Sequence, residues 1–129
     1  MAQILLFNIG ADKLRRLRPL ALRLGILCRS IAPEEHGKAL GTLCGRDGFE
    51  TAGEDASAAP FQAEMLVMDA LSTAQFHGLL DGLRRERATV ALKAVVTESN
   101  LSWTAARLQR ELSAEHEAMK KAAGKSIHS

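Results

Sequence analysis

Seven residues of the sequence could form a small ligand-binding site, because they follow apolar stretches of the kind that make buried strands. They comprise polar side chains, one glycine and the only tryptophan: Asn8, Gly10, Asp69, Thr97, Glu98, Asn100 and Trp103. Together they could orient a small molecule by hydrogen bonds beside an aromatic surface. They contain no nucleophile with an adjacent base, so the sequence assigns no catalytic residue.

Two of these residues have a structural role that would explain them as well. Asn100, like Ser102, is a typical N-cap for the helix expected after it. Trp103 can anchor the start of that helix by covering the end of a sheet, since a tryptophan buries a large area. Capping and anchoring are the simpler interpretations, and ligand binding is the alternative.

Motifs for metal or nucleotide chemistry are incomplete in this sequence. Cys28, His36 and Cys44 lack the close cysteine pair and the fourth ligand of a structural zinc site. Both thiols are expected to be free and to pack as small apolar groups. The segment "NIGADK" has one glycine where a dinucleotide-binding loop needs three. We therefore expect no metal and no cofactor.

Asp69 and Thr97, each at the end of an apolar stretch, resemble the corresponding residues of phosphate-accepting receiver domains in bacterial signalling. Such domains hold magnesium with an acidic pair after the first strand and use a lysine after a fifth strand. Here position 8 is asparagine, Asp12 is the nearest acid, and no fifth strand follows. Too few carboxylates remain for a hard divalent cation, which argues against phosphotransfer to Asp69. A non-phosphorylated, receiver-like regulatory module stays open.

Short apolar stretches alternate along the chain with segments of helical periodicity. Strands are expected over residues 3–9, 26–31, 65–70 and 92–97. Helices are expected over residues 12–24, 33–45, 72–87 and from 100 or 102 to 119. Pro19 predicts a kink in the first helix or a helix that starts only a few residues before it. Ser72 and Gln75 predict a capping box.

This alternation predicts one α/β domain over residues 1–120 and a disordered tail over 121–129. Right-handed crossovers favour a four-stranded, mostly parallel sheet of order 2-1-3-4 with helices on both faces, a truncated flavodoxin-like or Rossmann-like three-layer sandwich. We expect all four strands to point the same way, so that the ends of strands one, three and four meet at one rim. Residues 45–63 are expected to form a mobile surface loop or lid. No internal repeat is recognised.

Three segments carry a resemblance to a known family: "ILLFNIGADKLRRLRPLALRLGI", "EMLVMDALSTAQFHGLLDGLRRE" and "LKAVVTESNLSWTAARLQRELSAEHEAM". Together they are similar to a bacterial family of small α/β proteins, the domain of unknown function DUF3783. The likeness runs from Ile4 to Met119. The resemblance implies an α/β fold but no activity, so it transfers no catalytic residue.

The composition is typical of a soluble globular protein. With 17 basic and 15 acidic residues the net charge is +2, too balanced to indicate a nucleic-acid or membrane partner. Residues 12–46 carry a net charge of +5 and residues 47–98 one of −5, a pattern that could serve a partner or self-association. The apolar N-terminal run lacks a basic leader and is short for a signal peptide, so we expect a cytoplasmic protein.

Two functional hypotheses follow. The first is a non-catalytic regulatory or protein-interaction domain that binds a protein partner or its own copy through the last helix or an edge strand. The alternative is a small-molecule or nucleotide binder, or an enzyme, with its site at the carboxyl ends of strands one, three and four.

Overall fold

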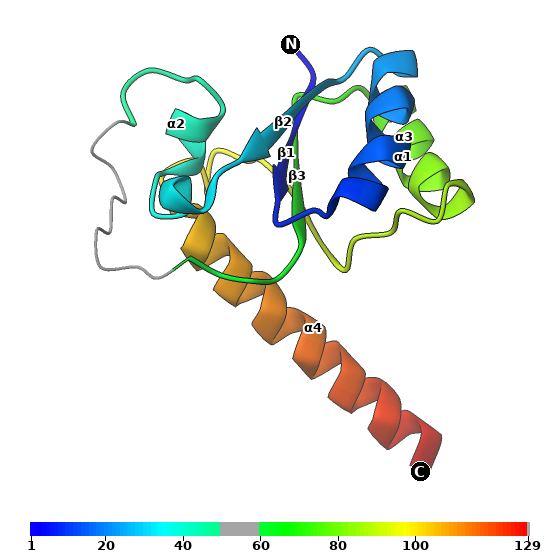
Figure 1. Ribbon diagram of the computed structural model, residues 1–129. Coiled ribbons are helices and arrows are strands. Elements are labelled where there is room, and N and C mark those ends of the chain that lie inside the picture. Colours follow the sequence, from blue (N-terminus) through cyan, green and yellow to red (C-terminus); the bar gives the residue numbers. More distant parts are fainter. Residues whose placement is uncertain (50–59, 129) are drawn as a thin grey trace.

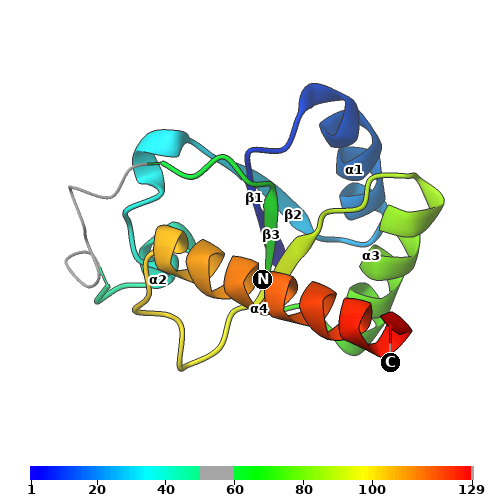
Figure 2. The same ribbon diagram turned by 90° about the horizontal axis from the view of Figure 1, so that it is seen from below.

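The computed structural model describes residues 1–49 and 60–128, with side chains described as far as Lys121. A four-stranded sheet lies at its centre (Figures 1 and 2). The strands are β1 (Gln3–Phe7), β2 (Leu27–Ile31), β3 (Met65–Asp69) and β4 (Leu92–Val95), in the order β2-β1-β3-β4. The predicted α/β class and strand order are confirmed. Most of the predicted loop over residues 45–63, and with it the lid, lies outside the described residues.

Helices pack against both faces of the sheet. On one face lie α1 (Ala11–Arg23) and α3 (Thr73–Arg85), and on the other lie the short α2 (Leu40–Leu43) and the long α4 (Ala105–His128), as Figure 2 shows. Even-numbered residues of β1 and β3 point toward α1 and α3, while odd-numbered residues point toward α2 and α4. Both central strands are buried throughout, which explains their continuous apolar sequences.

The strands do not all point the same way. β1 pairs with β2 in parallel and β3 pairs with β4 in parallel, but β1 and β3 run antiparallel. The sheet is mostly parallel as predicted, whereas the expected common direction of all four strands is wrong. The chain between β2 and β3, residues 32–64, returns to the sheet at the edge where β2 ended. A flavodoxin-like sheet is parallel throughout, so this one differs from it at its central pair.

Several helix boundaries also differ from those predicted. The second helix is split into a 3₁₀ turn at Pro33–Glu35 and the four-residue α2. α1 continues through Pro19 as one helix. The Ser72 capping box is confirmed, with Gln75 N donating to Ser72 Oγ at 3.1 Å. α4, which extends to His128, includes most of the residues expected to form a tail.

The two halves of the chain repeat the same backbone path about a twofold axis through the sheet. Leu5 lies opposite Val67, each at the middle of its strand. Each half is a strand, a 13-residue helix and a second strand parallel to the first. Asn8 and Ala70, which follow β1 and β3, both have φ of 60°. The helices end alike, with Ile26 N bonded to Ala21 O and Ala88 N bonded to Leu83 O.

The same symmetry relates the segments that follow β2 and β4. Ala39 and Thr104 form an isolated antiparallel bridge. Around it, Leu40 N donates to Trp103 O at 2.9 Å, and Ala105 N donates to Lys38 O at 3.2 Å. α2 and α4 therefore begin at equivalent places. The repeat is not visible in the sequence, because it is carried by backbone geometry rather than by similar side chains.

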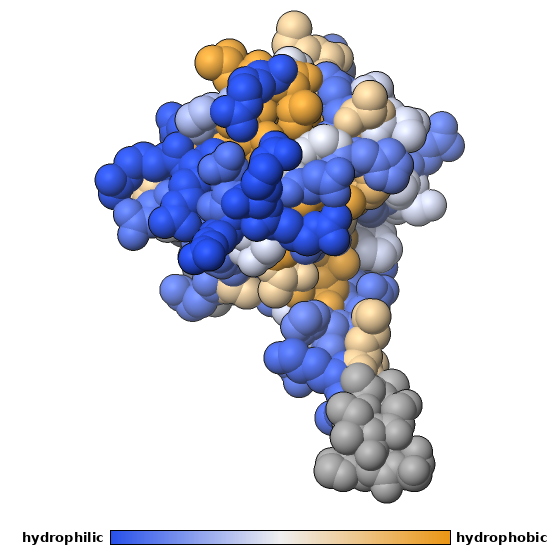
Figure 3. Space-filling view, turned by 90° about the vertical axis from the view of Figure 1, so that its right-hand side faces the viewer, coloured by the Kyte–Doolittle hydropathy of each residue, from blue (hydrophilic) through white to orange (hydrophobic). Residues whose placement is uncertain are grey.

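α4 is much longer than its counterpart α2 and leaves the body of the molecule (Figure 1). At 1.5 Å per residue its 24 residues span about 36 Å. No helix in the part of the chain that the structure describes is long and apolar enough to cross a membrane. Seen from the side of α1 and α3, the surface is mainly hydrophilic, with a group of hydrophobic residues at the end where the N-terminus lies (Figure 3).

Candidate functional site

The antiparallel central pair divides the predicted site residues between two edges of the sheet. Asn8 and Gly10 follow β1 at one edge. Asp69 ends β3 at the opposite edge, and Thr97, Glu98 and Asn100 follow β4 there. The expectation that the ends of strands one, three and four form one rim is therefore wrong.

Asn8 and Gly10 have structural roles at their edge. Asn8 Nδ2 donates to Phe61 O at 2.8 Å and to Ala63 O at 2.9 Å, which fixes the chain just before β3. Asparagine also tolerates the left-handed backbone that this position adopts. Gly10 is the N-cap of α1, and its carbonyl accepts a hydrogen bond from Leu14 N at 3.0 Å.

Asn100 fixes a turn and does not cap α4. Its Oδ1 accepts a hydrogen bond from Thr97 N at 2.8 Å, and its Nδ2 donates to Val95 O at 3.1 Å. Glu98 is exposed in the same turn. Thr104 caps the helix instead, with its Oγ1 accepting from Arg107 N at 3.0 Å.

Trp103 lies at the start of α4, half-buried against the core between α4 and the sheet. The Arg107 guanidinium lies over its ring, 4.1 Å from the ring centre. The Trp103 carbonyl accepts the hydrogen bond from Leu40 N that joins the two halves. These contacts match the anchoring role.

Among the predicted site residues, Asp69 accepts hydrogen bonds from the largest number of side-chain donors. Its side chain is 5% exposed and accepts two hydrogen bonds from Arg46, at 2.7 Å from Nη2 and 3.2 Å from Nη1. Gln3 Nε2 donates to Asp69 Oδ2 at 2.8 Å and to Cys44 O at 3.0 Å. Gln3 and Asp69 are opposite one another in the antiparallel pair, which places both side chains on the same face.

These groups line a cavity of about 370 Å³ that opens beside the end of α2. We call it the Arg46 pocket, and its lining residues are Met1, Gln3, Leu27, Arg29, Cys44, Arg46, Asp69 and Ala70. Arg29 projects from β2 and donates to Leu43 O at 2.8 Å. The guanidinium groups of Arg29 and Arg46 and the carboxylate of Asp69 together give the pocket a net charge of +1.

The ionisation of the pocket favours binding over catalysis. Burial would raise the pKa of Asp69, but hydrogen bonds from Arg46 and Gln3 outweigh it and hold that pKa below its ordinary value of 3.8. Burial, and then the charge of Asp69, raise the pKa of the Cys44 thiol to about 11. The carboxylate is therefore charged and already bonded, and the thiol is protonated at neutral pH.

The pocket exists because α2 ends early. After Leu43 the chain turns at Gly45, whose φ of +82° favours glycine, and Arg46 follows. In the second half α4 continues and covers the corresponding strand. Accordingly Leu92 on β4 is 6% exposed, while Leu27 at the equivalent place on β2 is 50% exposed.

Sequence reasoning missed Gln3, Arg29 and Arg46. Gln3 carried a usable signal, because it is a polar residue at the start of a strand that is otherwise apolar. Its partner Asp69 is likewise a polar residue at the end of an apolar strand, and the antiparallel register would have paired them. Arg46 carried no comparable signal, since it lies in an irregular segment after a short helix.

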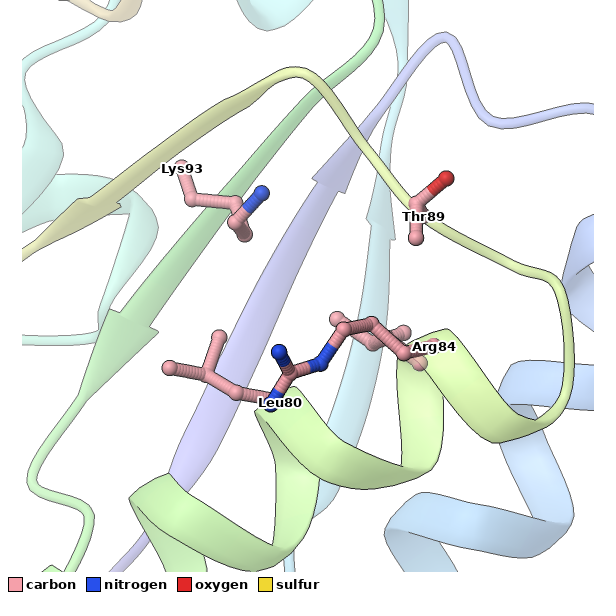
Figure 4. Close-up of a pocket in the computed structure, with 5 residues that line it drawn as sticks. Leu80, Arg84, Thr89 and Lys93 are labelled. Atoms are coloured by element: carbon pink, nitrogen blue, oxygen red, sulfur yellow. The ribbon is translucent and has the colours of Figure 1, made fainter.

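A second cavity, of about 280 Å³, lies between α3 and β4 (Figure 4). Leu80 and Leu83 form its apolar part, while Arg84 and Lys93 reach toward it. Both cations already have partners, since Arg84 pairs with Asp81 at 2.7 Å and Lys93 Nζ donates to Val90 O at 2.5 Å. This cavity contains no buried charged group, so the Arg46 pocket is the better candidate site.

His36, which the zinc motif had drawn attention to, is a buried aromatic residue. Its ring stacks on Phe61 with centroids 4.1 Å apart and meets Phe7 edge-on at 5.6 Å. Within the described residues neither ring nitrogen has a hydrogen-bond partner. Burial lowers the pKa of His36, and the charge of Glu34 opposes this only in part.

The buried His36 should make stability depend on pH. Its pKa is below the 6.5 of the unfolded chain, so protons bind the unfolded state more tightly. The unfolding free energy should fall as pH drops through 6.5, with a slope that approaches about 1.4 kcal/mol per pH unit. Urea unfolding between pH 5 and 8 measures this slope. His36→Leu should flatten the slope, whereas His77→Leu, at an exposed position, should leave it unchanged. Equal slopes in the parent protein and both variants would show that His36 does not cause the pH dependence.

Comparison with protein families gives one match. Residues 64–119 match the model of a domain of unknown function, DUF3783. Over these residues the chain is similar to DUF3783. The match begins one residue before β3 and ends within α4, so it corresponds to the second half of the repeat. The segment from Ile4 to Ile26 lies outside it. No curated protein and no solved structure matches the chain.

Proposed function

We propose that this protein is a non-catalytic interaction domain that pairs with a second copy of itself through the far part of α4. The observation that carries the proposal is the exposure of this helix beyond its contact with the sheet. Every side chain from Glu117 to Lys121 is exposed, and Met119 is 72% exposed. Ala105 and Leu108, by contrast, are buried against the sheet.

A helix without tertiary contacts gains little stability in water. The part of α4 from Glu117 to His128 is about as long as the shortest isolated helices that are marginally stable. Packing against another helix would supply the missing burial. A large exposed apolar residue such as Met119 is suited to that contact, since methionine adapts its shape to irregular surfaces.

The order of charges favours a second copy in antiparallel orientation. Three acids precede Met119 and two lysines follow it directly: Glu111, Glu115, Glu117, Lys120 and Lys121. A twofold axis near Met119 would place the acidic part of each helix beside the basic part of the other. The ion pair between Glu117 and Lys120, at 4.0 Å and well exposed, is weak enough to be exchanged for such contacts.

The absence of catalysis is supported by the Arg46 pocket, where the thiol is protonated and the carboxylate is bonded to Arg46 and Gln3. The alternative hypothesis, a small-molecule site made by the ends of strands one, three and four, loses its geometric basis because these ends lie at opposite edges. A cytoplasmic location is part of the proposal and is supported by two free cysteines.

Self-association is tested by sedimentation over a range of protein concentrations. We expect a monomer–dimer equilibrium whose dissociation constant rises about ten-fold or more in Met119→Ser. Leu22→Ser is the matched control, because Leu22 is also an exposed apolar residue but lies on α1. Reversing Lys120 and Lys121 to glutamate should weaken the dimer, and reversing Glu115 and Glu117 to lysine in the same chain should restore it. A monomer at every concentration, or equal effects of the two serine variants, would rule out the proposed pairing.

A further inference from the structure

We propose that the Arg46 pocket binds a small ligand through an anionic oxygen group, a carboxylate or a phosphate. The proposal is independent of pairing through α4, because no residue of the pocket belongs to that helix. The volume of about 370 Å³ falls within the range of pockets that hold small molecules.

Asp69 holds the Arg46 side chain in a position from which it can bind an anion. The carboxylate is almost fully buried and holds both terminal nitrogens of the guanidinium, whose side chain is 40% exposed. Each of these nitrogens carries a second hydrogen, and Nε carries one. An arginine that is fixed in this way pays little conformational entropy when it binds an anion.

Arg29 supplies the charge that Asp69 does not neutralise. Its only hydrogen bond within the described chain goes to the Leu43 carbonyl, and no carboxylate there forms an ion pair with it. Arg29 and Arg46 line the same cavity from β2 and from the segment after α2. Two guanidinium groups facing one space are suited to the planar oxygens of a carboxylate or to a phosphate.

The twofold repeat provides an independent argument that this place is specialised. At the symmetric position of the central strand pair, Phe7 lies opposite Met65, and both are fully buried apolar residues. On the pocket side the same position holds Gln3 opposite Asp69. A buried carboxylate costs desolvation that an apolar pair avoids. Packing of the core therefore does not explain the pair of Gln3 and Asp69. The pair does hold Arg46 in position, through the hydrogen bonds between Asp69 and Arg46.

The remaining walls suit a ligand that carries a small apolar part. Leu27 and Met1 line the cavity and are exposed, and Ala70 adds another apolar surface. The Cys44 thiol stays protonated and uncharged at neutral pH, so it adds no negative charge to the pocket. The pocket therefore combines two cations with apolar groups that can contact the body of an organic acid.

Binding is tested on the full chain by amide chemical-shift titration with citrate and with phosphate, each at constant ionic strength against chloride. We expect saturable shifts at Gln3, Arg29 and Arg46, and the anion with the lower dissociation constant identifies the preferred group. Arg29→Gln should weaken that affinity about ten-fold, as for the loss of a hydrogen bond to a charged group. Arg84→Gln, which removes the same charge from an exposed position on α3, should leave it unchanged.

Three results would overturn the proposal. They are no saturable shift with either anion, shifts located away from the pocket, and equal weakening by Arg29→Gln and Arg84→Gln, which would indicate a general effect of net charge. Arg29 is exposed and makes one hydrogen bond to a carbonyl, so its glutamine variant should keep the fold. Repeating the titration on Met119→Ser separates anion binding from self-association.

Discussion

Gly82→Leu should destabilise the protein by about 3 kcal/mol, because the position has no space for a larger side chain. Gly82 on α3 faces Leu20 on α1, and the two occupy equivalent places in the two halves. A Cβ atom at Gly82 would lie 2.4 Å from Leu20 Cδ1 and 2.6 Å from Cδ2. Leu20 is itself 2% exposed and cannot move toward solvent without leaving the core. Denaturant unfolding measures the loss.

A double-mutant cycle separates this steric effect from a general loss of stability. Leu20→Ala alone leaves a cavity and should also cost about 3 kcal/mol. Combining it with Gly82→Leu restores the volume, so the double variant should be more stable than the sum of the two losses predicts, by at least about 1 kcal/mol. Gly78→Leu, which meets only the half-buried Leu24, should cost less than Gly82→Leu. Strict additivity would show that the two positions do not share one space.

The pair of Leu20 and Gly82 also explains why the internal repeat is hard to see in the sequence. Near a twofold axis equivalent residues face each other, and two leucines at this point would overlap. One half must therefore carry a small residue where the other carries a large one. Elsewhere Gln3 corresponds to Met65, and Asp69 to Phe7. The halves share backbone geometry and hydrogen bonds but not side-chain type.

Strand order could be predicted because it depends on local patterns that the sequence displays. The apolar runs at Gln3–Phe7 and Met65–Asp69 are continuous, which is typical of strands buried on both faces, and each precedes a periodic helical segment. Strand direction could not be predicted in the same way. It depends on where the chain re-enters the sheet after residues 32–64, and the short α2 in that connection does not cross to the opposite edge of the sheet.

The candidate site was predictable only at Asp69. A carboxylate at the end of an apolar strand is conspicuous, but its partners come from the first strand and from an irregular turn. Gln3 becomes a neighbour only through the antiparallel register, and Arg46 only because α2 stops at Leu43. Asn8 and Asn100 were conspicuous for the opposite reason. The Asn100 side chain closes a tight turn, and the Asn8 side chain holds the segment before β3.

Asp69→Asn should lower the unfolding free energy at neutral pH by about 2 kcal/mol, because it leaves buried donors without a charged acceptor. Arg46 and Gln3 both point N–H groups at this side chain, and an amide can accept from only one side while its NH₂ group faces the other donor. The cost is moderated because the Arg46 side chain is 40% exposed and can turn toward water. Urea unfolding of the two proteins measures the difference.

Asp81→Asn is the matched control for this substitution. Its ion pair with Arg84 has the same 2.7 Å separation, but both side chains are well exposed, so the loss should stay below about 0.5 kcal/mol. The pH dependence supplies a second check. The pKa of Asp69 is held below 3.8, so its stabilisation is present above that pH and is lost as pH falls through the folded-state pKa. Asp69→Asn should lack this acid transition while Asp81→Asn keeps it. If both substitutions cost the same, burial adds nothing to the ion pair between Asp69 and Arg46, and the pocket would lose the rigid guanidinium on which anion binding depends.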